Sequence, residues 1–347
     1  MAPQLSIIVP VYNVEKYIHT CVESIFKQGL DDECFEVIIV NDGSTDRSME
    51  MIQDIFIQHQ NTIIINQEQQ GVSVARNNGI ETAQGEYIQF VDADDFLIEN
   101  SLLFLLDKAI TSKADIITAD YIRMNDNQIA QFAKDVFKQK DGASQERTGE
   151  EFLLKDHSPY SCHIWRSLYR RDFINQNKLR FIPDIYYEDI PYTYECYLNA
   201  KQCIKVNWQY VIYRKGQRSI TSSLNKKKAM DFCLAISKIW NYSHYENLSD
   251  QIREKIRNNT FIHFSLLLCA ITSSTSLSKS EKMDVLYYIR DLIPDLSFRN
   301  GLKQNIVNFL YHKMPSTYMT LRIFYAEYLQ DTIWKIGDTI RNKKVYE

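Results

Sequence analysis

Three of the four residues at positions 92–95 are aspartates: Asp92, Asp94 and Asp95. They follow an apolar, β-prone run within the stretch Tyr87–Phe96. Unit charges about 4 Å apart repel by roughly 4 kcal/mol at an effective dielectric constant near 20, so a positive group is expected beside them. Hard divalent cations such as Mn²⁺ or Mg²⁺ bind through oxygen and suit such a site. The structural alternative is that Asp94 or Asp95 caps a helix that begins near Ile98.

The acidic stretch follows the last of four apolar runs that alternate with helical patterns. The predicted strands are Leu5–Val9, Glu36–Val40, Thr62–Asn66 and Tyr87–Val91, and the predicted helices between them are Glu15–Gln28 with Asn13 as its cap, Arg47–His59, and one opened by Gln70-Gly71 that carries Arg76 and Asn77. This alternation predicts an α/β fold, a mostly parallel Rossmann-like sheet with helices on both faces. Ligands of such sheets bind beyond the carboxyl ends of the strands. We therefore expect the polar residues after Val9, Val40 and Val91 to face one crevice.

Other features of the sequence exclude several classes of protein. A net charge of −4 gives no basic field for a nucleic acid partner. Neither a dinucleotide fingerprint nor a phosphate loop follows a predicted strand, so a cation held by the carboxylates is expected to neutralise any bound diphosphate. The seven cysteines form no Cys-x-x-Cys, no apolar run is long enough for a membrane span, and a strand begins almost at once. We therefore expect reduced thiols, no signal peptide and a cytoplasmic location.

The second half of the chain is rich in aromatic and basic residues. Glu188 and Asp189 stand at the start of a predicted helix, where a carboxylate could act as a base or merely cap the helix. Arg214 and Arg218 follow a predicted strand, and each could pair with diphosphate oxygens or be solvated at the surface. The aromatic residues Trp165, Tyr169, Tyr192 and Tyr194 are candidate platforms for a sugar, with core packing as the alternative.

Five motifs in order resemble family 2 glycosyltransferases and together cover about Leu5–Thr221. The quoted motifs are Ser6-Ile-Ile-Val-Pro-Val-Tyr-Asn13, Val40-Asn-Asp-Gly-Ser-Thr-Asp46, Gly71-Val-Ser-Val-Ala-Arg-Asn77, Val91-Asp-Ala-Asp-Asp95 and Tyr187-Glu-Asp189. The resemblance implies a glycosyltransferase A-type fold, a nucleotide-sugar donor, a divalent metal and inversion at the anomeric carbon. One departure is Gln70, which stands where the family commonly has Asn.

The resemblance also implies roles for individual residues. Asp42 would bond the base and Arg76 would lie against it, Asp92 would contact ribose or metal, Asp94 would be the principal metal ligand, and Asp189 would be the catalytic base, with Glu188 orienting it or holding the acceptor. The expected donor site as a whole comprises Pro10, Val11, Tyr12, Asn13, Glu15, Asp42, Gly71, Arg76, Asp92, Ala93, Asp94, Arg214 and Arg218. Trp165 and Tyr169 are the candidate acceptor residues.

We expect a catalytic domain over residues 1–224, with a nucleotide-binding half at 1–100 and an acceptor half at 101–224, followed by a helical region over 225–347. Within that region, Pro315–Lys344 has apolar residues at helical spacing with interleaved basic ones. It could contact the inner face of the cell membrane beside a lipid-linked acceptor, form a subunit interface, or pack on the catalytic domain.

The expected function is a metal-dependent, inverting hexosyltransferase that moves a sugar from a nucleotide donor, UDP-linked by resemblance, to a glycan or lipid-linked hydroxyl. Such an enzyme would serve surface polysaccharide or glycoconjugate synthesis. Two alternatives are a sugar-nucleotide nucleotidyltransferase, which would need a basic glycine-rich opening loop, and a non-catalytic carbohydrate-binding scaffold, against which the intact Asp92, Asp94 and Asp189 argue.

Overall fold

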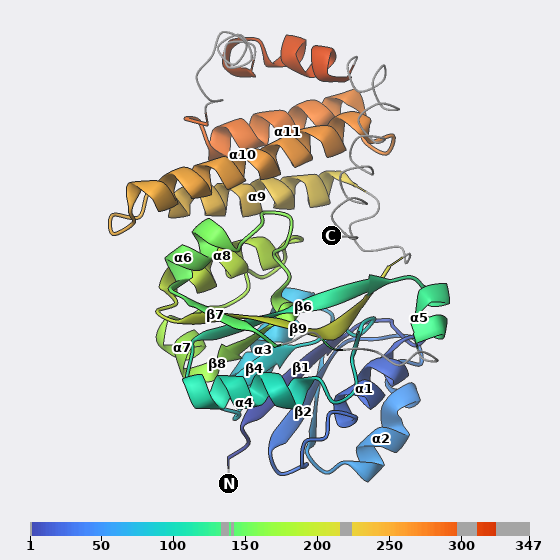
Figure 1. Cartoon of the computed structure of the whole chain (residues 1–347). Coiled ribbons are helices and arrows are strands. Elements are labelled where there is room, and N and C mark those ends of the chain that lie inside the picture. Colours follow the sequence, from blue (N-terminus) through green and yellow to red (C-terminus); the bar gives the residue numbers. More distant parts are fainter. Residues whose placement is uncertain (1, 133–138, 140–141, 216–223, 297–310, 324–347) are drawn as a thin grey trace. The chain divides into compact units, whose positions relative to one another are not determined.

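The computed structural model describes residues 2–132, 139, 142–215, 224–296 and 311–323 (Figure 1). The chain divides into two compact units, Met1–Ser219 and Ile220–Glu347, and each is described separately below. The predicted functional boundary after residue 224 stays a prediction.

The first half of unit 1 is the parallel sheet that the sequence predicts. Its strands are β1 (Leu5–Val11), β2 (Phe35–Asp42), β3 (Thr62–Gln67) and β4 (Tyr87–Phe90), in the spatial order β3-β2-β1-β4 (Figure 1). Leu5 pairs with Phe35 on one side and with Tyr87 on the other, so β1 is central. Residues such as Ile7 and Ile39 are fully buried, which explains the continuous apolar runs.

The second half of unit 1 extends the same sheet with antiparallel pairs. β8 (Ser167–Arg170) lies antiparallel between β4 and β6 (Ile116–Met124), and β9 (Cys203–Arg214) runs parallel to β6. The short strands β5 (Phe96–Leu97) and β7 (Ser144–Arg147) pair antiparallel with β9. The α/β class is confirmed, and the sheet is parallel over β1 to β4 and mixed beyond them.

Helices surround this sheet and bury its apolar faces (Figure 1). They are α1 (Ile18–Phe26), η1 (Glu50–Ile52), α2 (Gln53–Gln58), α3 (Val72–Thr82), α4 (Leu102–Ser112), α5 (Asp126–Phe132), α6 (Gly149–Lys155), η2 (Ile164–Arg166), α7 (Arg171–Gln176) and α8 (Asp189–Asn199). A Cβ on Gly79 would come within 2.4 Å of Ile8 Cγ2, so glycine allows α3 to lie directly on β1.

The alternative in which Asp94 or Asp95 caps a helix is wrong. The chain after Asp95 forms strand β5, and the next helix, α4, begins only at Leu102. The acidic residues therefore lie in a loop between two strands, where they cap no helix.

The described part of unit 2 is helical, as predicted. Its helices α9 (Lys226–Tyr242), α10 (Asp250–Ser273) and α11 (Lys279–Leu292) lie side by side (Figure 1), and α9 packs against both of the others. Their N-caps are Asn225, Ser249 and Ser278, each of which accepts a backbone N–H with its side chain.

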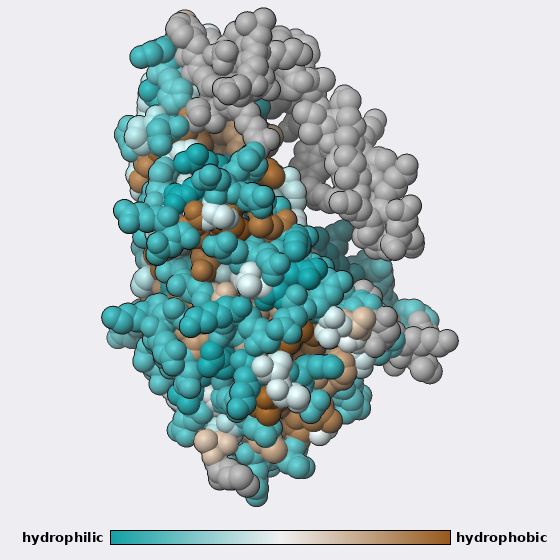
Figure 2. Space-filling model, turned by 60° about the vertical axis from the view of Figure 1, so that its left-hand side comes forward, coloured by the Kyte–Doolittle hydropathy of each residue, from teal (hydrophilic) through white to brown (hydrophobic). Residues whose placement is uncertain are grey.

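The amphipathic segment predicted over Pro315–Lys344 lies mostly outside the described residues. Its first part, residues 315–323, is helical, and Leu321 is 51% exposed. Figure 2 shows mainly hydrophilic residues on the face that it displays, among the residues that are coloured. None of the helices described in the structure has the length and apolar character to cross a membrane.

Candidate active site

The loops after β1 and β2 are tied together at the carboxyl ends of these strands. Asn13 has a left-handed backbone with φ of 51°, and its side-chain oxygen accepts from the backbone N–H groups of Thr45 at 2.8 Å and Asp46 at 3.3 Å. Glu15 accepts from the Arg47 N–H at 3.1 Å. Asn13 was predicted to cap the following helix, and this is wrong because its amide serves the second loop and α1 begins at Ile18. Tyr12, the first residue after β1, is 40% exposed.

Asp42, at the end of β2, fixes the loop that leads into α3. Its Oδ1 accepts from Gln67 Nε2 and from the Gln70 backbone N–H, both at 2.7 Å, and its Oδ2 accepts from the Gly71 N–H at 2.8 Å. Gln70 takes part through its backbone, so the departure from Asn at this position does not alter the contact. Gly71 has φ of 89°, a conformation that favours glycine. The predicted contact between Asp42 and a base stays a prediction.

The acidic loop after β4 is held in place by the end of β9. The backbone N–H of Arg214 donates to Asp95 Oδ1 at 2.8 Å, and its Nε donates to the Asp94 carbonyl oxygen at 3.2 Å. The guanidinium also bonds Asp126 at 2.6 Å and lies 5.0 Å from the centre of the Tyr17 ring. Arg214 was predicted to meet a diphosphate directly, but in this structure its donors hold the acidic loop. Arg218 lies outside the described residues.

Arg76 joins the two halves of unit 1. One terminal nitrogen donates to Asp92 Oδ1 at 2.8 Å and the other to Glu188 Oε1 at 2.6 Å, across 112 positions of sequence. Burial alone would lower the pKa of Arg76, but Asp92 and Glu188 together raise it above its ordinary value. Arg76 is only 5% exposed, and its guanidinium is enclosed between two carboxylates. Its expected position against a base stays a prediction.

The neighbouring residue, Asn77, docks the segment that leads to Glu188. Its side chain accepts from the Phe181 N–H at 2.9 Å and donates to the Phe181 carbonyl oxygen at 2.8 Å. The segment then reaches Tyr187, whose φ of 66° is in the left-handed region that a bulky residue rarely adopts. Strained backbone of this kind concentrates at functional sites, and here it immediately precedes Glu188 and Asp189. The sequence carried no signal for it.

Asp189, the first residue of α8, lies within the field of the acidic loop. Burial raises the pKa of its carboxyl well above the ordinary value, and the charges of Glu188 and Asp92 add to this effect while Arg76 opposes it. The structure thus brings Asp189 near Asp92, although 96 residues separate them in the sequence, as the numbering shows. A partly buried carboxylate with a raised pKa is suited to accept a proton.

The acidic loop fits a hard cation. Burial, followed by the charge of Asp92, raises the pKa of Asp94 to about 6, and burial with the charges of Asp94 and Asp92 raises that of Asp95 to about 9. These shifts record negative charge that the protein neutralises only in part. In the described part of the chain, no three His, Cys, Asp or Glu side chains are grouped as a complete metal site. The arrangement suits an ion that takes one or two carboxylates from the protein and its other ligands from a diphosphate.

All four candidate platforms for a sugar are buried, including the two candidate acceptor residues. Trp165 is 4% exposed, and its ring lies nearly parallel to the rings of His163 and Tyr213, whose centres are 4.8 and 5.5 Å away. Tyr169 is 3% exposed and contacts the Phe90 ring edge to face at 5.9 Å. Neither ring offers a free face to a sugar, so the packing alternative holds for both. Tyr192 and Tyr194 are also buried.

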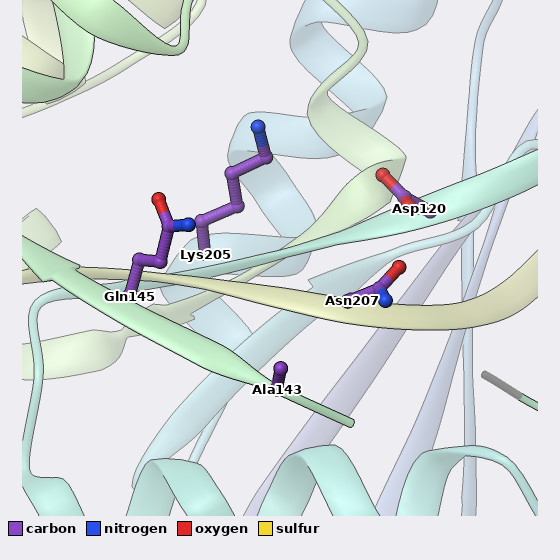
Figure 3. A pocket seen from close by; sticks show the side chains of 5 residues that line it. All are labelled: Asp120, Ala143, Gln145, Lys205 and Asn207. Carbon is purple, nitrogen blue, oxygen red and sulfur yellow. The ribbon is translucent and has the colours of Figure 1, made fainter. Parts of the chain in front are cut away.

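A cavity of about 330 Å³ opens elsewhere on unit 1, beside β6, β7 and β9 (Figure 3). It is lined by Asp120, Ala143, Gln145, Lys205 and Asn207. None of these residues belongs to the predicted site, so the volume of this cavity does not by itself identify the active site.

Comparisons with known proteins agree with this geometry. Residues 6–176 match the family model described as glycosyl transferase family 2. Over 297 residues the chain is 31% identical to the uncharacterized glycosyltransferase EpsJ of Bacillus subtilis (strain 168), and the match covers 84% of each protein.

Solved structures show the same fold. S. aureus TarS 1-349 in complex with UDP-GlcNAc has a TM-score of 0.71 at 20% identity, over 94% of this chain and 91% of that one. The mannosyltransferase PcManGT from Pyrobaculum calidifontis, in complex with GDP-Man and Mn²⁺, has a TM-score of 0.55 at 13% identity, over 96% and 88% of the two chains.

Proposed function

The chain belongs to glycosyltransferase family 2 and is a glycosyltransferase, and we propose that it transfers a hexose from a UDP-linked donor to a hydroxyl acceptor with inversion at the anomeric carbon. The observation that carries this proposal is the bridge from Asp92 through Arg76 to Glu188, because it sets the acidic loop beside the predicted base. The UDP-GlcNAc in the TarS complex supports UDP as the carrier, and the GDP-Man in the PcManGT complex makes GDP the alternative.

In this proposal the donor occupies the carboxyl ends of β1, β2 and β4. The loops fixed by Asn13 and Asp42 would border the nucleoside, and the residues proposed to line it are Pro10, Val11, Tyr12, Asn13, Glu15, Asp42, Gly71 and Ala93. The tethering of these loops to one another supports a preformed pocket.

Asp94 and Asp92 would hold a divalent cation, Mn²⁺ or Mg²⁺. When bound there, the cation would neutralise the negative charge of the departing diphosphate. The Mn²⁺ in the PcManGT complex supports this assignment. Arg214 contributes by holding the Asp94 backbone and the Asp95 carboxylate, which keeps the loop in one conformation.

Asp189 would act as the base for an acceptor hydroxyl. As the acceptor oxygen forms its bond to the anomeric carbon, the bond from that carbon to the diphosphate oxygen breaks, Asp189 takes the hydroxyl proton, and the nucleoside diphosphate leaves. A raised pKa makes the Asp189 carboxylate a stronger base than an ordinary aspartate. Glu188, held by Arg76, would position Asp189 and the acceptor.

The acceptor is proposed to be a glycan or lipid-linked hydroxyl in surface polysaccharide or glycoconjugate synthesis. Contact with the inner face of a membrane and self-association through the C-terminal helices both stay predictions, because most of Pro315–Lys344 lies outside the described residues.

The test combines donor binding with loss of the base. A thermal-shift screen of nucleotide sugars with Mn²⁺ or Mg²⁺ should select one donor, since a ligand of the folded state raises the melting temperature. Asp189→Asn should keep donor binding and lose roughly two to four orders of magnitude in turnover. The matched control, Asp172→Asn, changes another aspartate in the first turn of a helix and should be neutral.

Three results would contradict the proposal in different ways. Turnover of Asp189→Asn near that of the unaltered protein would reject Asp189 as the base. Release of pyrophosphate in place of nucleoside diphosphate would indicate a nucleotidyltransferase. Binding of sugars without any turnover would indicate a scaffold.

A further inference from the structure

A cluster of aromatic and cationic side chains lies where β6, η2 and β9 meet, and among its members only Trp165 had a predicted role. We call it the Arg-aromatic cluster, and its members are Tyr121, Arg123, His163, Trp165, Arg166 and Tyr213. The rings of His163 and Trp165 stack at 4.8 Å with a 9° angle, and Tyr121 meets Trp165 edge to face at 4.8 Å. This packing makes a rigid support for the two arginines.

Arg123 is the exposed cation of the cluster. Its guanidinium lies 5.5 Å from the centre of the Tyr121 ring and 5.7 Å from that of Tyr213, and it donates to the Tyr121 hydroxyl at 3.0 Å. Among the described residues, no carboxylate lies within ion-pair distance of Arg123. It is therefore oriented by aromatic rings while its charge stays available to a ligand.

Arg166 is the second arginine of the cluster, 5.9 Å from the centre of the Tyr121 ring and paired with Asp120. It donates to the Ala119 carbonyl oxygen at 3.0 Å and to Ser161 Oγ at 2.9 Å, and Asp120 lies 3.8 Å away. Burial, followed by the charges of Arg123 and Arg166, lowers the pKa of His163 to about 3. The histidine is thus neutral at physiological pH, mainly because it is buried and in addition because the two arginines disfavour its protonated form.

The cluster borders both parts of the proposed active site. Tyr213 immediately precedes Arg214, which holds Asp94 and Asp95. On the other side, the Cys162 carbonyl accepts from Thr193 of α8 at 3.4 Å, and the charge of Asp189 contributes to the raised pKa of the Cys162 thiol. The cluster is therefore joined to the acidic loop through Tyr213, and to α8 through the residue that precedes His163.

We infer that Arg123 binds an anionic group, a phosphate or a carboxylate, on the sugar acceptor. This inference rests on the proposed function and specifies the substrate class of the same site. The acceptor is favoured over the donor diphosphate because Arg123 and Arg166 stand in the half of the unit that follows the acidic loop. Moreover, the arginines that bond the acidic loop are Arg214 and Arg76.

The test is equilibrium binding of short oligomers to the full chain, with UDP and Mn²⁺ present. Two anionic probes, a glycerol phosphate trimer and trigalacturonic acid, distinguish phosphate from carboxylate, and maltotriose is the neutral probe of similar length. Arg123→Gln removes the charge at an exposed position. The matched control is Arg47→Gln, whose side chain is 71% exposed and paired with Glu50.

We expect at least one anionic probe to bind more tightly than maltotriose and to lose roughly tenfold to a hundredfold in affinity in Arg123→Gln, as for loss of a charged hydrogen bond. Arg47→Gln should bind it like the unaltered protein. The inference is overturned if Arg123→Gln binds the anionic probes within twofold of the unaltered protein, or if neither anionic probe binds better than maltotriose. A separate titration of UDP tests the proposed function, so the two failures are distinguishable.

Discussion

Replacing Arg76 by methionine should destabilise unit 1 and weaken donor binding together. The guanidinium is enclosed, with 6% of its side chain exposed, and it is the partner of two carboxylates whose side chains are 29% exposed at Asp92 and 13% at Glu188. Methionine keeps much of the volume and removes both charged hydrogen bonds. The variant therefore leaves two partly buried anions without a partner, beside Asp94 and Asp189.

The expected loss follows from these exposures. Removing one partner of a buried ion pair costs about 3–5 kcal/mol, and the partial exposure of Asp92 moves the expected loss to about 3 kcal/mol. Urea unfolding followed by fluorescence measures this loss. The control is Arg180→Met, which breaks the pair with Glu81, a residue 67% exposed, and should cost less than about 1 kcal/mol.

A double variant separates the ion pair from simple packing. Glu188→Gln removes one of the anions that Arg76→Met leaves unpaired, so the double variant should be more stable than the sum of the single losses predicts, by about 1 kcal/mol or more. Strict additivity would show that the two side chains do not interact in solution. A loss below about 1 kcal/mol in Arg76→Met would likewise refute the bridge as a structural element.

Two further predictions concern the strand-end loops. The Asp94 carboxyl has its pKa raised to about 6, and only its ionised form binds a metal. The affinity for Mn²⁺, measured by calorimetry, should therefore fall as the pH decreases below 6 and should be lost in Asp94→Ala. An affinity unchanged between pH 5 and 7.5 would contradict this prediction. Asp42→Ala leaves the N–H groups of Gln70 and Gly71 without their acceptor and should cost about 1–3 kcal/mol in urea unfolding. The exposed control Asp54→Ala should stay within about 0.5 kcal/mol, and an equal effect of both would show that the loop does not depend on Asp42.

The parallel half of the sheet was predictable because its sequence signals are local. Strands β1, β2 and β4 are buried on both faces, and each reads as a continuous apolar run that ends at polar residues. The antiparallel half gave weaker signals. β5 has only two residues, Phe96 and Leu97, and it exists because it pairs with Val211 and Ile212, more than a hundred positions later. No local periodicity encodes such a pairing.

The candidate site divides in the same way: the residue types could be predicted from the sequence, and the distant residues that contact them could not. Roles for Asp94 in cation binding and for Asp189 as a base could be proposed from residue type and motif order. In the structure, the charge of Asp92 acts on both carboxyl groups. The position of Arg76 could not be predicted, because a helical pattern places a residue on a face and does not name what a distant segment brings to that face. Here the distant segment is fixed by Asn77 through two hydrogen bonds to Phe181, a contact without a sequence signature.

The charge of Asp92 links the two halves of the proposed reaction. It contributes to the raised pKa of Asp94, where a cation is proposed, and to that of Asp189, where a proton is proposed to go. Arg76 opposes this effect at Asp189 while it bonds Asp92 directly. A change in the charge of Asp92 must therefore alter both the affinity for cations and the strength of the base. An amide at position 92 would relieve the repulsion, but it would also weaken the two properties that the reaction requires.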